Sequence, residues 1–444
     1  MSEEDTAPLM VAPFRLDSLR EPGAPPPPPE PEHGRHAVHS HRKRRSKRRI
    51  ALLVVVLLLI AAAGGVAGRR LSAADPAPVV TPVATVKVAV PAHPVTLPWP
   101  ATGQAAVAIP AIGVIVPSGA EQPVPVASLT KLMTAYVILR DHPVAVHQTG
   151  PSITVTQADV DDYDHDAVND DSNALVAVGE QLTEQQLLGG LLVHSADNYA
   201  DLLARWDAGS TPAFVAKMNA TATQLGMLHS HFDDASGISA ASLSTAADML
   251  KVAGLDMANA TFSSIVRTTS VTLPLAGTLS TYTPLIGLQG IIGVKSGYTA
   301  AAGGCDVLAV VRTVHGRPVL LLAAVTGQTG VAVLAQAGLH GLALVDAMAP
   351  LIGTTPVVRQ GQLAAQVRSA GRTVDARTAA SASVLTWPGV EATRVFHPVH
   401  HLTDQARRGA RVGTVEVTLG LQHVAVPVRL QQDVPRESLL QRLF

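Results

Sequence analysis

Ser128-Leu129-Thr130-Lys131 is the stretch that decides the fold, because two further motifs follow it in a recognisable order. Ser195-Ala196-Asp197-Asn198 comes second, and Lys295-Ser296-Gly297 comes third. An isolated Ser-x-x-Lys is weak evidence, and another one occurs at residues 40–43 in a basic stretch. Three motifs in this order are typical of enzymes that form an acyl intermediate on a serine and use a lysine as its base.

The first motif pairs a nucleophile with a base. Residues three apart lie on one face of a helix, so the amine of Lys131 is within reach of the Ser128 hydroxyl. A serine becomes a nucleophile when a base takes its proton, and a lysine serves when burial or a nearby cation favours its neutral form. Ala127 and Leu132 make the surroundings apolar, and Lys295 is a second cation. We therefore predict Ser128 as the nucleophile and Lys131 as its base, rather than an exposed lysine on a helix surface.

The third motif lies on a predicted strand whose edge is free to pair with a substrate. A peptide substrate docks there as an added strand, with Lys295 and Ser296 binding its terminal carboxylate. Gly297 has no side chain where the substrate comes close. The backbone N–H groups of Ser128 and Tyr298 then face the developing oxyanion. The alternative is that the glycine and tyrosine only form a turn.

The segment around the motifs predicts an α+β fold. Short apolar runs predict two strands in a hairpin, a long helical insert, three strands at hairpin spacing and a closing helix. This order implies an antiparallel sheet covered by helices. The expected strands are 105–109, 113–116, 291–298, 307–312 and 319–325, and the expected helices start at 128 and cover 187–193, 199–203, 214–225 and 331–348.

A second, smaller domain is expected after the helical pattern ends. Residues 356–433 are rich in Val, Thr and Gly and contain short alternating runs, which predict a small β-sandwich. Residues 361–367 and 409–415 are similar to each other and look like two copies of one strand and turn unit.

The N-terminal part predicts a membrane anchor. A basic block at 42–49 is followed by residues 50–67, which carry no charge and are long enough for a helix that spans a membrane. The basic block alone is compatible with nucleic-acid binding, but its position beside an apolar run favours a membrane. The side richer in Lys and Arg stays in the cytoplasm, so the chain after Arg70 is expected outside. A cleaved signal peptide has a much shorter leader, so we expect a retained anchor.

Two segments beside the anchor are expected to lack a core. Residues 1–49 form a polar, Pro-rich tail, which we expect to be disordered and cytoplasmic. Residues 71–100 carry seven prolines, which predict a stiff, extended linker. Cys305 is the only cysteine among 444 residues, so the chain forms no internal disulfide.

An acidic stretch at residues 159–173 has aspartates at the alternate spacing of a calcium loop. Ala167 stands where such a loop needs glycine, and Asn173 stands where it needs a bidentate glutamate. We therefore expect a solvated acidic loop and no metal or cofactor.

Residues 101–353 resemble the D-alanyl-D-alanine carboxypeptidases, the low-molecular-mass penicillin-binding proteins of the S11 peptidase group. Besides the three motifs, the resemblance includes residues 127–134, 218–219, 225–227, 236–237 and 293–299. It implies the fold of serine β-lactamases and penicillin-binding transpeptidases. It also implies removal of the terminal D-alanine from the pentapeptide stems of peptidoglycan and acylation by β-lactam antibiotics. The C-terminal β-rich domain is similar to that family's second domain, though less closely.

One departure from the family concerns the middle motif, which is usually Ser-x-Asn. Here the third position is Asp197, and the asparagine follows as Asn198. Either a bulged turn lets Asn198 serve, or Asp197 replaces it and changes the charge beside Lys131. The alignment of Ser195 with Asp197 needs no gap, which favours Asp197.

Two other functions use the same arrangement of motifs. A class A β-lactamase needs a glutamate between its second and third motifs, and no glutamate occurs between Ser195 and Lys295, so we do not expect a lactamase of that class. The alternative that is not an enzyme is a tethered protein that binds or scaffolds the cell wall. In that case Asp197, in place of the family's asparagine, would be the change that removed turnover.

Overall fold

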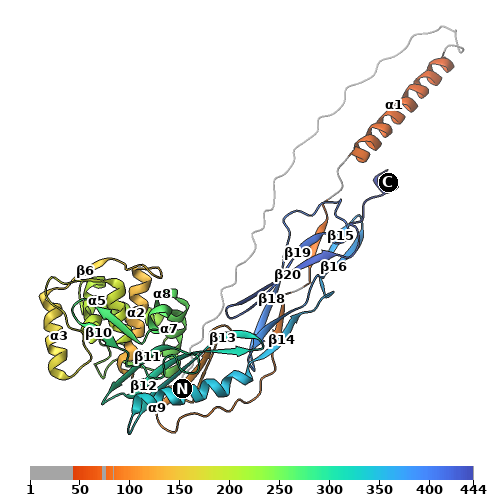
Figure 1. Ribbon diagram of the computed structural model, residues 1–444. Coiled ribbons are helices and arrows are strands. Elements are labelled where there is room, and N and C mark those ends of the chain that lie inside the picture. Colours follow the sequence, from red (N-terminus) through yellow and green to blue (C-terminus); the bar gives the residue numbers. More distant parts are fainter. Residues whose placement is uncertain (1–43, 73–76, 84, 444) are drawn as a thin grey trace, which may run out of the picture. The chain divides into compact units, whose positions relative to one another are not determined.

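The structure is a computed structural model that describes residues 44–72, 77–83 and 85–443 (Figure 1). The expected tail therefore lies outside the described residues, except for the part from Arg44 onward. The chain divides into two compact units. One contains α1 (Arg44–Ser72) and the short α10 (Leu439–Leu443), and the other contains the described residues between them.

The predicted membrane span at 50–67 lies within α1. Its portion Arg49–Ser72 is long and apolar enough to cross a membrane, and none of it is buried. The stretch Val333–Leu351 also meets this criterion of length and composition, but it is partly buried in the folded unit.

A five-stranded antiparallel sheet forms the centre of the motif-bearing region, in the order β11-β12-β13-β3-β4. The α+β prediction is confirmed, and each predicted strand is present. The strands are β3 (Gln104–Ile109), β4 (Val114–Pro117), β11 (Ile291–Thr299), β12 (Gly303–Val314) and β13 (Arg317–Gln328).

Helices cover both faces of this sheet. Alternate residues of each strand point to opposite sides, and on the central strands the residues on both sides are apolar. Val307 and Ala309 of β12 pack into the core on the side of the helical insert. Leu308 and Val310 pack into the other core, which includes the buried face of α9 (Val333–Met348). Figure 1 shows α9 along one face and the helices of the insert on the other.

The helical insert carries the second motif. Its helices are α2 (Thr130–Asp141), α3 (Gln157–Asn169), α4 (Glu184–Val193), α5 (Asp197–Ala208), α6 (Thr211–Gln224), α7 (Ala246–Ala258) and α8 (Ala260–Val266). Small two-stranded sheets are formed by β5 (Val124–Pro125) with β8 (Leu243–Ser244), β6 (Ser152–Thr154) with β7 (Gln181–Thr183), and β9 (Ser270–Leu273) with β10 (Gly277–Ser280).

The acidic stretch expected as a loop is a helix, so that prediction is wrong. Thr156 caps α3 together with Asp159 in a capping box. Asp159 and Asp162 lie one turn apart, and both bind the guanidinium of Arg205. Pairing with Arg205 compensates the repulsion between these carboxylates. Among the described residues, no group of three or more acidic, histidine or cysteine side chains is placed to hold a metal.

The C-terminal domain contains a seven-stranded antiparallel sheet in the order β1-β15-β16-β20-β19-β18-β2 and a separate pair, β14 with β17. Its strands after the catalytic region are β14 (Gly353–Val358), β15 (Leu363–Ser369), β16 (Arg372–Thr378), β17 (Ala382–Thr386), β18 (Glu391–Pro398), β19 (Arg411–Leu419) and β20 (Gln422–Leu430). Short 3-10 turns lie at Ala127–Leu129 and Ala349–Leu351.

The stretch expected as a free linker, residues 71–100, instead supplies both end strands of this sheet. β1 (Val79–Pro82) pairs with β15, and β2 (Val86–Ala89) pairs with β18. Val80 and Val88 pack against the domain core. The proline content misled the prediction because an edge strand tolerates prolines that a central strand does not.

The predicted repeat is present in the C-terminal domain. Gly361 donates its N–H to the carbonyl of Thr378 at 2.9 Å, and Gly409 donates to the carbonyl of Leu430 at the same distance. The carbonyl of Arg359 accepts the N–H of Gln362, and that of Arg407 accepts the N–H of Ala410. Each copy therefore starts with the same turn before its hairpin.

Candidate active site

Ser128 lies at a backbone turn that opens α2. It is the central residue of the 3-10 turn Ala127–Leu129, which runs directly into the helix. The Ser128 side chain lines a cavity of about 210 Å³, whereas the flanking Ala127 and Leu129 are buried. The turn therefore presents the hydroxyl to the cavity while the helix holds its backbone in place.

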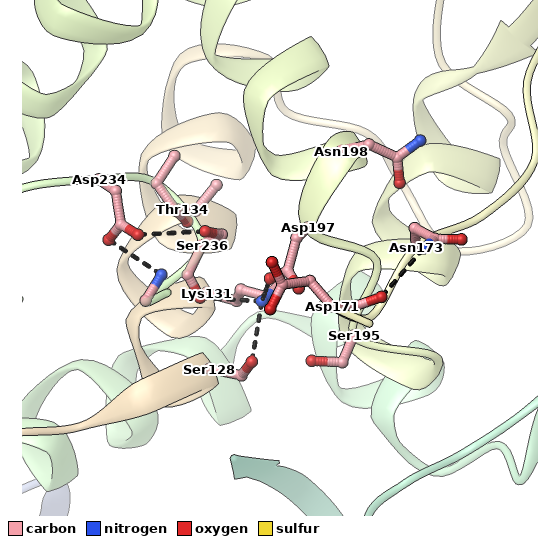
Figure 2. A network of polar contacts seen from close by, with 12 residues as sticks. Ser128, Lys131, Thr134, Asp171, Asn173, Ser195, Asp197, Asn198, Asp234 and Ser236 are labelled. Carbon is pink, nitrogen blue, oxygen red and sulfur yellow. Dashed lines mark hydrogen bonds and ion pairs between the residues drawn. The ribbon is translucent and has the colours of Figure 1, made fainter. Parts of the chain in front are cut away.

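Lys131 lies one helical turn from Ser128, as predicted, and is fully buried. Its Nζ donates to Ser128 Oγ at 2.9 Å and to the carbonyl of Ser236 at 2.8 Å. It also forms an ion pair with the carboxylate of Asp197 (Figure 2). These three partners fix the amine beside the hydroxyl, which is the geometry that a general base needs.

The structure places Asp197 in the site and Asn198 outside it. Ser195 has a left-handed backbone, with φ at 65°, and lies in the middle of the tight connection between α4 and α5. Asp197 begins α5 and points to Lys131, while Asn198 points away (Figure 2). The Asn198 amide instead bonds the backbone N–H and carbonyl of Ala174, at 3.0 and 2.9 Å. The option that Asn198 serves in the middle motif is therefore not what the structure shows.

Asp197 is a buried carboxyl next to a buried amine. Burial raises the pKa of Asp197, and the charge of Lys131 opposes that rise. Opposite charges attract strongly where water is excluded, so this ion pair holds the Lys131 amine in place beside the Ser128 hydroxyl.

Exchanging Asp197 for asparagine is expected to move the acidic limb of the acylation rate to lower pH. Asp197→Asn removes a negative charge that pairs with Lys131 and raises the pKa of Lys295, so the pH dependence of the site moves to lower pH. Stopped-flow acylation by a β-lactam, measured as a function of pH, checks this. Asn198→Ala is the matched control and should leave the limb in place, because its side chain bonds only the Ala174 backbone. An unmoved limb in Asp197→Asn contradicts the assignment.

Lys295 lies on β11, and its side chain contacts Ser195 of the second motif. It is fully buried, and its Nζ donates to Ser195 Oγ at 2.9 Å and to the carbonyl of Ser296 at 2.8 Å. Burial, and then the charge of Lys131, lower the pKa of Lys295 to about 7. Lys295 does not line the cavity, so its charge acts on a ligand from behind Ser195 and Ser296.

The other residues of the third motif line the cavity. Ser296 donates its hydroxyl to the carbonyl of Tyr282 at 3.0 Å, and Tyr298 is exposed at the cavity. A Cβ at Gly297 would lie 2.6 Å from the backbone nitrogen of Ser128, so only glycine fits between the strand and the turn. β11 is an end strand of its sheet, and no other described strand pairs with its outer edge.

Asp234 is an organising residue that the sequence analysis missed. Its carboxylate accepts the N–H of Gly237 at 2.9 Å, the N–H of Ser239 at 2.9 Å and the hydroxyl of Ser242 at 2.6 Å. The turn that it closes carries the Ser236 carbonyl that binds Lys131. The similarity of residues 236–237 to the family was a signal for this turn, but it did not identify the aspartate.

Further side chains that line the cavity were also missed. The charged side chains that line it are all acidic, because Lys131 and Lys295 lie behind the wall. Leu334 comes from α9, and the others come from loops and strand ends whose position the local pattern does not determine. The missed residues are Asp170, Asp171, Ser172, Gly237, Ile238, Tyr282, Thr299 and Leu334.

Comparisons with known proteins agree with this geometry. Residues 103–328, which contain all three motifs, match the peptidase S11 family, described as D-alanyl-D-alanine carboxypeptidase. A D-alanyl-D-alanine carboxypeptidase of Streptomyces sp. (strain K15) is 36% identical over 203 residues, which cover 42% of this chain and 67% of that protein. A D-alanyl-D-alanine endopeptidase of Haemophilus influenzae is 37% identical over 130 residues, which cover 29% of this chain and 41% of that protein.

The fold has a counterpart among solved structures. The crystal structure of penicillin binding protein 5 from Haemophilus influenzae matches with a TM-score of 0.54 and 18% sequence identity. The match covers 77% of this chain and 99% of that chain. At this identity the likeness concerns the fold alone.

Proposed function

Because the chain belongs to the S11 family of D-alanyl-D-alanine carboxypeptidases, we propose how its own residues perform that family's reaction. The chain is a serine-type hydrolase that acts on peptidoglycan and binds penicillin. The observation that carries the proposal is the contact of a fully buried Lys131 amine with the Ser128 hydroxyl at 2.9 Å.

In the acylation step, Ser128 Oγ attacks the carbonyl carbon of the penultimate D-alanine, and Lys131 takes its proton. The oxygen of that carbonyl becomes an oxyanion, which the backbone N–H groups of Ser128 and Tyr298 stabilise. The C–N bond then breaks, and D-alanine leaves. Ser195, which lines the cavity, passes its hydroxyl proton to the leaving nitrogen and takes in exchange the proton that Lys131 removed from Ser128. Water then cleaves the ester on Ser128.

The substrate is a stem peptide whose end lies along β11 as an added strand. Ser296 lines the cavity, and its hydroxyl exchanges the Tyr282 carbonyl for the terminal carboxylate of the substrate, while Lys295 offers a positive charge from behind. The position of β11 at the end of its sheet supports this placement.

The membrane arrangement is part of the same proposal. α1 anchors the chain, with the basic residues at its N-terminal end in the cytoplasm and the catalytic unit outside. This places the catalytic site on the side of the membrane where peptidoglycan lies.

Lys295→Ala is expected to raise KM for peptides with a free terminal carboxylate by about tenfold, since the positive charge behind Ser195 and Ser296 is lost. An amidated analogue should lose much less. The pKa of Lys295 is about 7, so the wild-type lysine is charged below that pH and neutral above it. KM for the free carboxylate should therefore rise as pH increases through 7, and this dependence should flatten in the variant. An equal rise in KM for the free carboxylate and for the amidated analogue would contradict the role of Lys295 in binding the carboxylate.

The experiment that tests the function is a pair of measurements on the same sample. Labelling by a fluorescent penicillin reports acylation, and release of D-alanine from a pentapeptide reports turnover. Both are expected. Labelling without release identifies the scaffold that has lost turnover, and absence of both contradicts the proposal.

A further inference from the structure

We propose that the C-terminal domain carries a second binding site, which takes a phosphate or carboxylate group on a small sugar or polyol. The site is a cavity of about 450 Å³ beside Arg359 and Arg394. Gln360, Gly361 and Gln362 complete its polar lining, and apolar residues such as Val357 form the rest. It is separate from the cavity at Ser128, with which it shares no residue.

The positive charge of Arg394 lacks the carboxylate partner that comparable arginines of this chain have. Between residues 77 and 438, the described chain has four half-buried arginines. Three of them have a carboxylate partner, namely Arg205 with Asp159 and Asp162, Arg312 with Asp346, and Arg377 with Asp375. Arg394 has none among the described residues, and its Nη1 donates to the carbonyl of Val357 at 3.3 Å. A half-buried guanidinium that lacks a counter-charge favours binding of an anion from solution.

The rest of the lining adds to that preference. Arg359 is a second guanidinium at the same cavity, and no aspartate or glutamate lines it. A guanidinium presents its N–H groups as a fork that matches the oxygens of carboxylate and phosphate. The side-chain oxygen of Gln362 accepts the backbone N–H of Arg359 at 3.4 Å, so its amide NH₂ remains available to a ligand hydroxyl.

The size of the cavity sets the size of the ligand. A volume of about 450 Å³ lies within the range of small-molecule sites and exceeds what a single oxyanion fills. The two arginines therefore bind the charged group, while the glutamines and the apolar wall contact the sugar or polyol that carries it.

The internal repeat supplies a matched control. Arg407 occupies the position in the second turn that Arg359 occupies in the first, because each carbonyl accepts the N–H three residues later. Arg407 is exposed like Arg359 but does not line the cavity. A general effect of surface charge would involve Arg407 as much as Arg359.

The test is calorimetric titration of the full chain in detergent at low ionic strength with glycerol 3-phosphate, glucuronate and the neutral compounds glycerol and glucose. We expect saturable binding of at least one anion and none of the neutral compounds. Arg394→Gln should weaken that binding at least about tenfold, Arg359→Gln should weaken it measurably, and Arg407→Gln should leave it unchanged. The preferred anion distinguishes a phosphate source from a carboxylate source.

β-Lactam acylation of each variant serves as the check on folding, because Ser128 lines a different cavity. If Arg394→Gln fails that check, the test rests on Arg359→Gln, which changes an exposed residue. Unchanged binding in Arg359→Gln then overturns the proposal. It is also overturned if neither anion binds the wild type saturably, if Arg394→Gln folds and binds normally, or if Arg407→Gln weakens binding as much as Arg359→Gln.

Discussion

Ser128→Ala is expected to abolish covalent labelling by β-lactams and release of D-alanine while leaving the protein folded. The hydroxyl supplies the atom to which the acyl group bonds, so no partial activity through this route survives its removal. The side chain is small and lines the cavity, so the core loses little. Labelling with a fluorescent penicillin, resolved on a denaturing gel, measures the effect.

Ser40→Ala is the control for this experiment, because Ser40 begins the other Ser-x-x-Lys of the chain. It should label like the wild type. Labelling that persists in Ser128→Ala and disappears in Ser40→Ala would move the nucleophile to the basic stretch.

Lys131→Ala is expected to slow acylation by about a thousandfold, within the range that removal of a general base produces. Within the described chain, the hydroxyl of Ser128 has no other amine in hydrogen-bond contact. The acylation rate of the purified variant measures the loss. Lys217→Ala is the control, since Lys217 pairs with Asp141 and Asp207 away from the cavity.

Removal of Lys131 also leaves the carboxyl of Asp197 buried without its partner, which destabilises a fold. The double variant Lys131→Ala with Asp197→Asn removes that charge as well. It should regain stability to heat but not acylation. A double variant that acylates at the normal rate would show that lysine is not the base.

Much of the catalytic unit was predictable because its signals are local. The apolar period placed the sheet strands within one to four residues of their observed ends, as at 307–312 against Gly303–Val314. The spacing of Ser128 and Lys131 predicted their contact, because residues three apart lie on one face of a helix.

The features that were missed or left open depend on tertiary structure. The sequence favoured Asp197 over Asn198 but left the choice open, because it rests on the left-handed turn at Ser195, which no composition signals for a serine. The position of Lys295 behind Ser195, outside the cavity wall, results from the packing of β11 against the helical insert. The strands β1 and β2 gain their structure by pairing with β15 and β18, almost 300 residues later in the chain.

The acidic helix α3 shows the same limit. The spacing of its aspartates matched a calcium loop only in part, and the stretch was therefore expected to be a solvated acidic loop. Arg205, on a different helix, pairs with Asp159 and Asp162 and allows the helix to form.

The most direct test of the central claim is to locate the acyl group. The wild-type protein is treated with a β-lactam, digested and analysed by peptide mass spectrometry, and a parallel sample is trapped during turnover of a pentapeptide. We predict that both samples carry the adduct on the peptide that contains Ser128, with D-alanine released in the second. An adduct on any other residue, or release of D-alanine without an acyl-enzyme at Ser128, would contradict the account.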